Sequence, residues 1–135
     1  MRRTQDVGPE RSFAFDFLDY NASEIARLGD SIFYFGELGM QEFETAKLMT
    51  ELLEEGGFTV ERGIACFPTA FCATFGSGSP VIAIHTEYDA NPDNSQKAGV
   101  TRPEAIVEGA PGQREGHNVN AAVMVAGALA AREAM

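Results

Sequence analysis

Two short runs of ionisable residues, each beside a turn, are the parts of this chain best suited to chemistry. His85, Glu87 and Asp89 follow an apolar run at residues 81–84, and Glu115-Gly116-His117 opens a helical pattern rich in small residues. Imidazole nitrogens and carboxylate oxygens are ligands of borderline and hard metal ions. The two runs together therefore predict a metal-binding site.

Glu87 and Asp89 are two positions apart, which places both side chains on the same side of an extended chain. Two carboxylates held there repel each other unless a cation or a proton separates them. A metal ion would resolve the repulsion, and a metal-free hydrolase that uses the pair as acid and base is an alternative. The plainer interpretation is that one carboxylate caps the loop at residues 91–92 and the other is solvated.

His117 and His85 each allow two interpretations. The dipole at a helix start disfavours positive charge, so His117 is expected to be neutral and able to bind metal, with Glu115 as an oxygen ligand. Alternatively, His117 is a capping residue and Glu115 is exposed, because a Glu-x-His pair is short and common. His85 is either a buried histidine bonded to the backbone or a residue that supports the site beside the carboxylates.

The remaining sequence predicts the elements that must position these side chains. Helices are expected at residues 22–35, 41–55 and from 117 or 118 to 134, and the first of them begins with a possible cap formed by Asn21 and Glu24. Strands are expected at residues 58–64 and 69–75. The continuous apolar run at residues 81–84 is typical of a strand that is covered on both faces.

Helices and strands in this order predict an α/β fold, with a layered sheet and helices on both of its faces. Residues 1–20 are expected to form an N-terminal arm, irregular over residues 1–12, and residues 21–135 a single domain. Ligands of such sheets bind at the carboxyl ends of the strands, which is where the first ionisable run stands. The loop at residues 91–114 is long for a compact domain, and such loops are usually functional or mobile.

Composition excludes some classes of partner. The 135 residues carry a formal net charge of −10, which repels phosphate backbones and anionic membranes, so neither is an expected partner. No apolar run is long enough to span a bilayer. Cys66 and Cys72 are too few for a disulfide scaffold, and we expect both to be buried thiols in a reducing compartment, which favours a cytoplasmic location.

Several motifs in a fixed order resemble those of a known family, the co-catalytic metallopeptidases that include aminoacylases, glutamate-type carboxypeptidases and auxin-conjugate amidohydrolases. The similarity covers roughly residues 22 to 134 and is greatest to the B-type subunits of the aminobenzoyl-glutamate hydrolases. The motifs are Gly36-Glu37-Leu38-Gly39, Glu42-Phe43, Glu55-Gly56-Gly57-Phe58, Phe67-Pro68-Thr69-Ala70-Phe71, Glu87-Tyr88-Asp89-Ala90-Asn91-Pro92 and Gly116-His117-Asn118.

The resemblance implies a metal-dependent amidohydrolase that cleaves the amide bond of an N-acyl amino acid or a similar small substrate, on a zinc-peptidase-like catalytic domain. It implies Zn²⁺ or Mn²⁺, with two ions in the complete enzyme. Asp89 takes a catalytic role beside the metal, Glu115 and His117 hold metal, and His85 and Glu87 lie in or just behind the ligand set. The branch usually has cysteine where this chain has Glu115, and a carboxylate favours harder ions such as manganese.

The resemblance also implies that the general base and further ligands lie beyond Met135. We therefore expect an N-terminal portion of a longer catalytic domain, inactive alone, that works as a homo-oligomer or with a companion C-terminal chain. The alternative is a non-catalytic α/β association module derived from the same fold. Apolar faces left uncovered in such a module would favour self-association.

Overall fold

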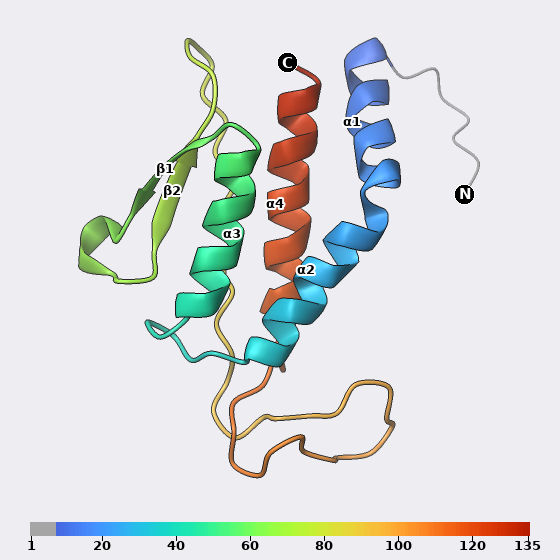
Figure 1. Ribbon diagram of the computed structural model, residues 1–135, viewed down its shortest axis with the longest axis vertical. Helices are drawn as coiled ribbons and strands as arrows, with labels where there is room; N and C mark the ends of the chain where they lie inside the picture. The colour runs from blue at the N-terminus through green and yellow to red at the C-terminus, as the bar shows by residue number, and fades with distance from the viewer. Residues whose placement is uncertain (1–7) are drawn as a thin grey trace.

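The computed structural model describes residues 8–135, which form four α-helices, a short 3-10 helix and a two-stranded antiparallel sheet (Figure 1). Residues 1–7 of the predicted arm lie outside the described residues. The elements, in chain order, are α1 (Pro9–Tyr20), α2 (Ala22–Phe35), α3 (Phe43–Glu55), β1 (Thr59–Arg62), η1 (Ile64–Cys66), β2 (Phe71–Thr74) and α4 (His117–Glu133).

The helix α1 corrects the prediction of an irregular arm. It begins at Pro9, where the fixed φ of proline suits the first helical position and its missing N–H costs nothing. The helix packs against α4, as Figure 1 shows, although none of its residues is fully buried. Asn21 belongs to the end of this helix, because its side-chain amide donates to the carbonyl of Phe17 at 2.8 Å. The predicted cap of the next helix by Asn21 is therefore wrong.

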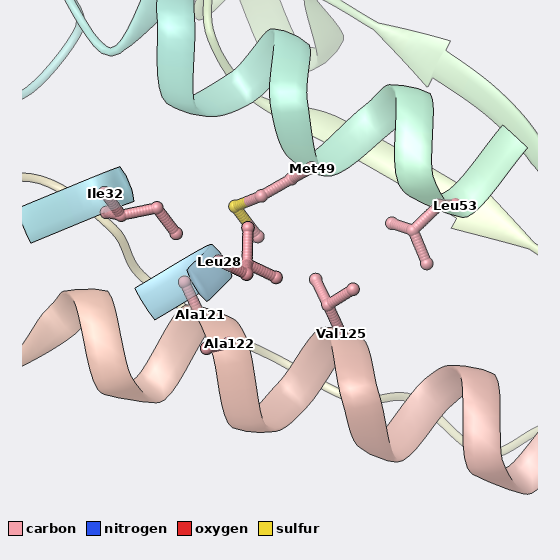
Figure 2. Close-up of a cluster of buried hydrophobic side chains, with 7 residues drawn as sticks. All are labelled: Leu28, Ile32, Met49, Leu53, Ala121, Ala122 and Val125. Carbon is pink, nitrogen blue, oxygen red and sulfur yellow. The ribbon is translucent and has the colours of Figure 1, made fainter. Parts of the chain in front are cut away.

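The helices α2, α3 and α4 enclose the core. The predicted bounds of α2 are confirmed, and its apolar stripe meets the inner faces of the other two helices (Figure 2). Ile32 and Met49 are completely buried. Small residues on α4 let the helices approach closely, since a Cβ added to Gly29 would lie 3.5 Å from Cβ of Ala122. The core residues are Leu28, Ile32, Met49, Leu53, Ala121, Ala122 and Val125.

The sheet is a hairpin of β1 and β2, in which Thr59 pairs with Thr74 and Arg62 with Phe71. Both predicted strands are confirmed in shorter form, and α3 packs against them. The mixed α/β class is confirmed. A layered sheet with helices on both faces is not found among residues 8–135, because the sheet has only two strands and the helices lie to one side of it in Figure 1.

The apolar run at residues 81–84 is not a buried strand, which corrects a second prediction. Val81 is 86% exposed and Ile82 is 83% exposed. A strand covered on both faces needs a hydrogen-bonded neighbour and packing layers, and residues 8–135 provide neither for this run. Cys66 and Cys72 are also exposed rather than buried, as free thiols.

Backbone pairing closes the long loop between the two ionisable runs. Asn91 and Gly112 exchange two hydrogen bonds of 3.0 Å, and the N–H of Ala90 donates to the carbonyl of Glu37 at 2.7 Å. Gly112 is required here, because a Cβ at that position would lie 2.0 Å from the carbonyl oxygen of Asn94. The chain therefore leaves the loop beside the point where it entered.

Candidate functional site

Three carboxylates surround the imidazole of His117. Its Nδ1 lies 2.8 Å from Oδ1 of Asp89, and its Nε2 lies 3.3 Å from Oε2 of Glu87 and 3.4 Å from Oε2 of Glu115. The structure thus brings together four of the five residues singled out in the sequence. Both ring nitrogens face carboxylate oxygens, while the side chain of His117 is only 17% exposed.

The local backbone explains this convergence. Glu87 and Asp89 precede the Asn91–Gly112 closure, whereas Glu115 and His117 follow it within a few residues. Gly116 has a φ of +83°, in the left-handed region that glycine adopts without strain, and this turn starts α4 at His117. The four side chains are therefore brought together by a loop that is closed at its base. They do not lie at the carboxyl ends of strands in a sheet, as the sequence predicted.

His117 is more basic than an isolated histidine. Burial lowers its pKa, but the hydrogen bond with Asp89 and the negative charges of Asp89, Glu87 and Glu115 act in the opposite direction, and the net pKa is raised. The dipole at the start of a helix acts in the same direction as burial and lowers this pKa, while the three nearby carboxylates raise it. That His117 binds metal through a neutral ring stays a prediction.

Asp89 also determines which nitrogen of His117 is available to a ligand. When Nδ1–H donates to Oδ1 of Asp89, the neutral ring carries its lone pair on Nε2, the nitrogen that faces Glu87 and Glu115. Metal-binding histidines commonly donate their second ring N–H to a carboxylate in this way.

His85 lies apart from this cluster. Its side chain is exposed, and it makes no hydrogen bond or ion pair with the residues that the structure describes. The interpretation of His85 as a buried histidine is therefore wrong. A role for it in the site stays a prediction.

A buried polar network behind Asp89 was not predicted. The hydroxyl of Tyr88 donates to the carbonyl of Thr69 at 2.6 Å, and the hydroxyl of Thr69 donates to Oε2 of Glu42 at 2.6 Å. Glu42 is only 7% exposed. Burial, followed by the charges of Glu42 and Glu37, raises the pKa of Tyr88 to about 12. These residues stand in the motifs quoted above, but nothing in their spacing indicates that they bond to one another.

The cluster is a set of polar contacts around one imidazole and not a preformed metal cage. Among residues 8–135, no group of three or more His, Cys, Asp and Glu side chains is arranged to hold a metal ion. The cause is visible in the geometry: Nδ1 of His117 is occupied by Asp89, and the side chains of Glu87 and Glu115 are 60% and 59% exposed. A ligand at this site would have to draw in these two long, exposed side chains.

Comparison with known proteins confirms one part of the resemblance, the similarity to the aminobenzoyl-glutamate hydrolases. The chain is 36% identical over 121 residues to the B-type subunit of the p-aminobenzoyl-glutamate hydrolase of Escherichia coli (strain K12). The matched region makes up 90% of this chain and 25% of that protein, so the chain spans about a quarter of the length of the curated relative it matches. No protein-family model matches the chain. No solved structure matches it either.

In the described part of the chain, no helix is both long and apolar enough to cross a bilayer. The cytoplasmic location inferred from the cysteines stays a prediction.

Proposed function

We propose that this chain is part of a metal-dependent amidohydrolase with a zinc-peptidase-like catalytic domain, in which Glu87, Glu115 and Nε2 of His117 bind a divalent ion. The observation that carries the proposal is the meeting of His117 with three carboxylates from a segment 28 to 30 positions earlier and from the turn before α4. The similarity to a protein named as a hydrolase of p-aminobenzoyl-glutamate supports amide cleavage as the reaction.

The side chains around Nε2 of His117 are of the types that bind such an ion, although Glu87 and Glu115 would have to move inward to share it. Nε2 of His117 lies 3.3 Å from the oxygen of Glu87 and 3.4 Å from that of Glu115. Zn²⁺ and Mn²⁺ are the proposed ions, because imidazole suits zinc while two carboxylates favour a harder ion.

Each residue of the cluster has a defined task in this proposal. Asp89 accepts the Nδ1–H of His117 and so keeps the ring in one orientation, with Nε2 toward the ligand position. Glu87 and Glu115 supply negative charge, which offsets that of a cation. When bound, a divalent ion polarises a carbonyl and lowers the pKa of bound water.

The substrate proposed is a small N-acyl amino acid or a related amide. The reaction also needs a general base, and a second ion needs its own ligands. We place these groups outside residues 8–135, on further chain or on a companion protein. The name of the relative, which is that of one subunit of a hydrolase, supports a companion.

Metal analysis of the purified chain tests the proposal. We expect zinc or manganese to bind the unaltered chain and to be lost in His117→Ala and Glu115→Ala. His85→Ala is the comparison, because it removes an imidazole that lies outside the cluster, and its metal content tests the predicted role of His85. Equal metal content in all four proteins would exclude the site. Hydrolysis that persists in chelator, once the complete assembly is available, would favour the acid/base pair Glu87 and Asp89 instead.

A non-catalytic association module is the second candidate, and a specific observation favours it. Val81, Ile82 and Ile84 are 86%, 83% and 48% exposed on a segment without strand partners in the described structure. Exposed apolar runs of this kind promote pairing with other chains. Self-association of the chain at equal strength with and without metal, together with no metal binding, would support this function.

A further inference from the structure

The side chain of Gln113 bridges the two segments that carry the candidate ligands. Its Nε2 donates a hydrogen bond of 3.2 Å to the carbonyl oxygen of Tyr88, and its Oε1 accepts one of 3.1 Å from the backbone N–H of Asn118. Tyr88 lies between Glu87 and Asp89, and Asn118 directly follows His117. A single amide group therefore joins the two halves of the cluster.

At the α4 end, Gln113 supplies an acceptor that the helix itself lacks. The first N–H groups of a helix have no intrahelical acceptor, and Gly116 at the N-cap has no side chain to offer one. Oε1 of Gln113 takes this role for Asn118. The side chain of Asn118 in turn donates to the carbonyl of Gly29 at 3.1 Å, a buried bond that joins α4 to α2. The start of α4 is thus held on two sides.

At the other end, Gln113 holds a segment that has no strand of its own. Residues 81–89 belong to no helix or strand, so few backbone bonds fix Glu87 and Asp89. The bond to the carbonyl of Tyr88 fixes this segment from one side, and the hydroxyl of Tyr88 fixes it from the other through Thr69. Gln113 therefore contacts both the segment that carries Glu87 and Asp89 and the start of α4 that carries His117.

We infer that Gln113 is a positioning residue, which sets the separation between the segment of Asp89 and the start of α4 so that the Asp89–His117 hydrogen bond forms. The effect of Gln113 on metal binding rests on the proposed function. Its effect on the Asp89–His117 hydrogen bond does not. Bridging the carbonyl of Tyr88 and the N–H of Asn118 needs one donor and one acceptor on the same short side chain. A carboxylate offers only acceptors when ionised, and an apolar chain of the same length offers neither.

Gln113→Met tests the inference, since methionine has a similar length and makes neither bond. Gln96→Met is the matched control. Gln96 is another bridging amide of the same loop, which donates to the carbonyl of Arg102 and accepts from the N–H of Glu104, away from the cluster. Circular dichroism is used first to check that both variants fold. Three measurements follow in each: amide hydrogen exchange at Asn118, the NMR signal of the His117 Nδ1 proton in metal-free protein, and the Kd for Zn²⁺.

For Gln113→Met we expect Asn118 exchange to rise about tenfold, the Nδ1 proton signal of His117 to broaden or vanish, and the Kd for Zn²⁺ to rise about 10- to 100-fold, as for other residues that support metal ligands. Gln96→Met should change none of the three. Faster exchange at Asn118 with an unchanged Nδ1 signal and an unchanged Kd would overturn the inference, because Gln113 would then be a helix cap only.

If Gln113→Met does not fold, Gln113→Glu separates the two bonds. Its carboxylate still accepts from Asn118 but cannot donate to the carbonyl of Tyr88. We expect protection at Asn118 to remain and the Nδ1 signal of His117 to weaken; an intact Nδ1 signal would again overturn the inference. If the unaltered chain binds no zinc, the proposed function fails, while the exchange and NMR measurements still decide the role of Gln113.

Discussion

Asp89 and His117 are 28 positions apart in the sequence, yet Oδ1 of the first lies 2.8 Å from Nδ1 of the second. This hydrogen bond connects a segment without regular structure to the first residue of α4. It is also the contact that makes the site more than a group of solvated charges, because it orients an imidazole whose side chain is only 17% exposed. The metal affinity of the cluster and the pH dependence of its stability should therefore depend on the hydrogen bond between Asp89 and His117.

Replacing Asp89 with asparagine should weaken metal binding without unfolding the chain. The amide still accepts a hydrogen bond from Nδ1 of His117, but it lacks the charge that strengthens this bond and the basicity of the ring. We expect the Kd for Zn²⁺, measured by titration calorimetry, to rise about tenfold or more. Asp30→Asn, an exposed substitution on α2, should leave it unchanged. An equal Kd in both variants would show that Asp89 does not act on the metal site.

The stability of the metal-free protein should fall as pH rises past neutrality. The folded pKa of His117 is raised above its ordinary value of 6.5, with burial opposed by the hydrogen bond and charges of the carboxylates. The stabilisation is therefore complete below the unfolded pKa and is lost as pH rises through the raised folded pKa. Urea unfolding from about pH 6 to about pH 8 measures it. His117→Gln should remove this pH dependence, and His85→Gln should keep it.

Glu37 should be important for stability because its carboxylate caps α3. It accepts the N–H groups of Glu44 and Thr45 at 2.9 Å and the hydroxyl of Thr45 at 2.7 Å. Glu37→Ala should lower the free energy of unfolding by about 1–2 kcal/mol, as the loss of a helix cap does. Glu37→Gln should recover part of this, and Glu55→Ala, at the exposed end of the same helix, should cost much less. Urea denaturation compares the three.

Met49 lies at the centre of the helical core with no exposed surface. Truncation to alanine removes buried atoms and leaves a cavity between α2, α3 and α4, so we expect a loss of about 2–5 kcal/mol in the free energy of unfolding. Met40→Ala, at a residue that is 56% exposed, should change it by less than about 0.5 kcal/mol. Similar losses in both variants would contradict the position of the core.

Ile82→Lys should reduce self-association without changing stability. The side chain is 83% exposed, so the substitution removes apolar surface and adds a charge to a segment that has no strand partner among residues 8–135. Sedimentation velocity should show a smaller share of oligomers for the variant than for the unaltered chain. If the oligomer population does not change, residues 81–84 are not the surface through which copies associate.

Much of the helical structure could be predicted because its signals are local. The stripe of Ile25, Leu28 and Ile32 and the glycine that follows at Gly36 define α2. The helix α1 could not be predicted in this way, since its residues form no buried stripe and its contact with α4 is tertiary. The apolar run at residues 81–84 predicted a burial that the described residues do not provide. A sequence pattern indicates that a segment suits a buried position. It does not indicate whether the residues that would bury the segment lie in the same stretch of chain.

The sequence could predict which residues form the candidate site, but not the contacts that bring them together. The residue types indicated Glu87, Asp89, Glu115 and His117, and the structure places these four together, whereas His85 is exposed outside the cluster. The pairing of Asn91 with Gly112 and the bridge made by Gln113 have no sequence pattern of their own, because amide and backbone bonds across a loop depend on the folded path. The roles of the residues in binding metal stay predictions.

The pairing of Asn91 with Gly112 allows the length of the loop to vary without a change in the geometry around His117. Residues 96–108 lie beyond the stem, which also contains the hydrogen bond from the N–H of Ser95 to the carbonyl of Ala110, and lengthening a closed loop adds entropy cost only slowly. Homologous proteins with shorter or longer insertions at residues 96–108 are therefore expected to retain the same arrangement at His117. For protein engineering, this makes the tip of the loop a tolerant position for grafting a new recognition segment next to an unchanged polar centre.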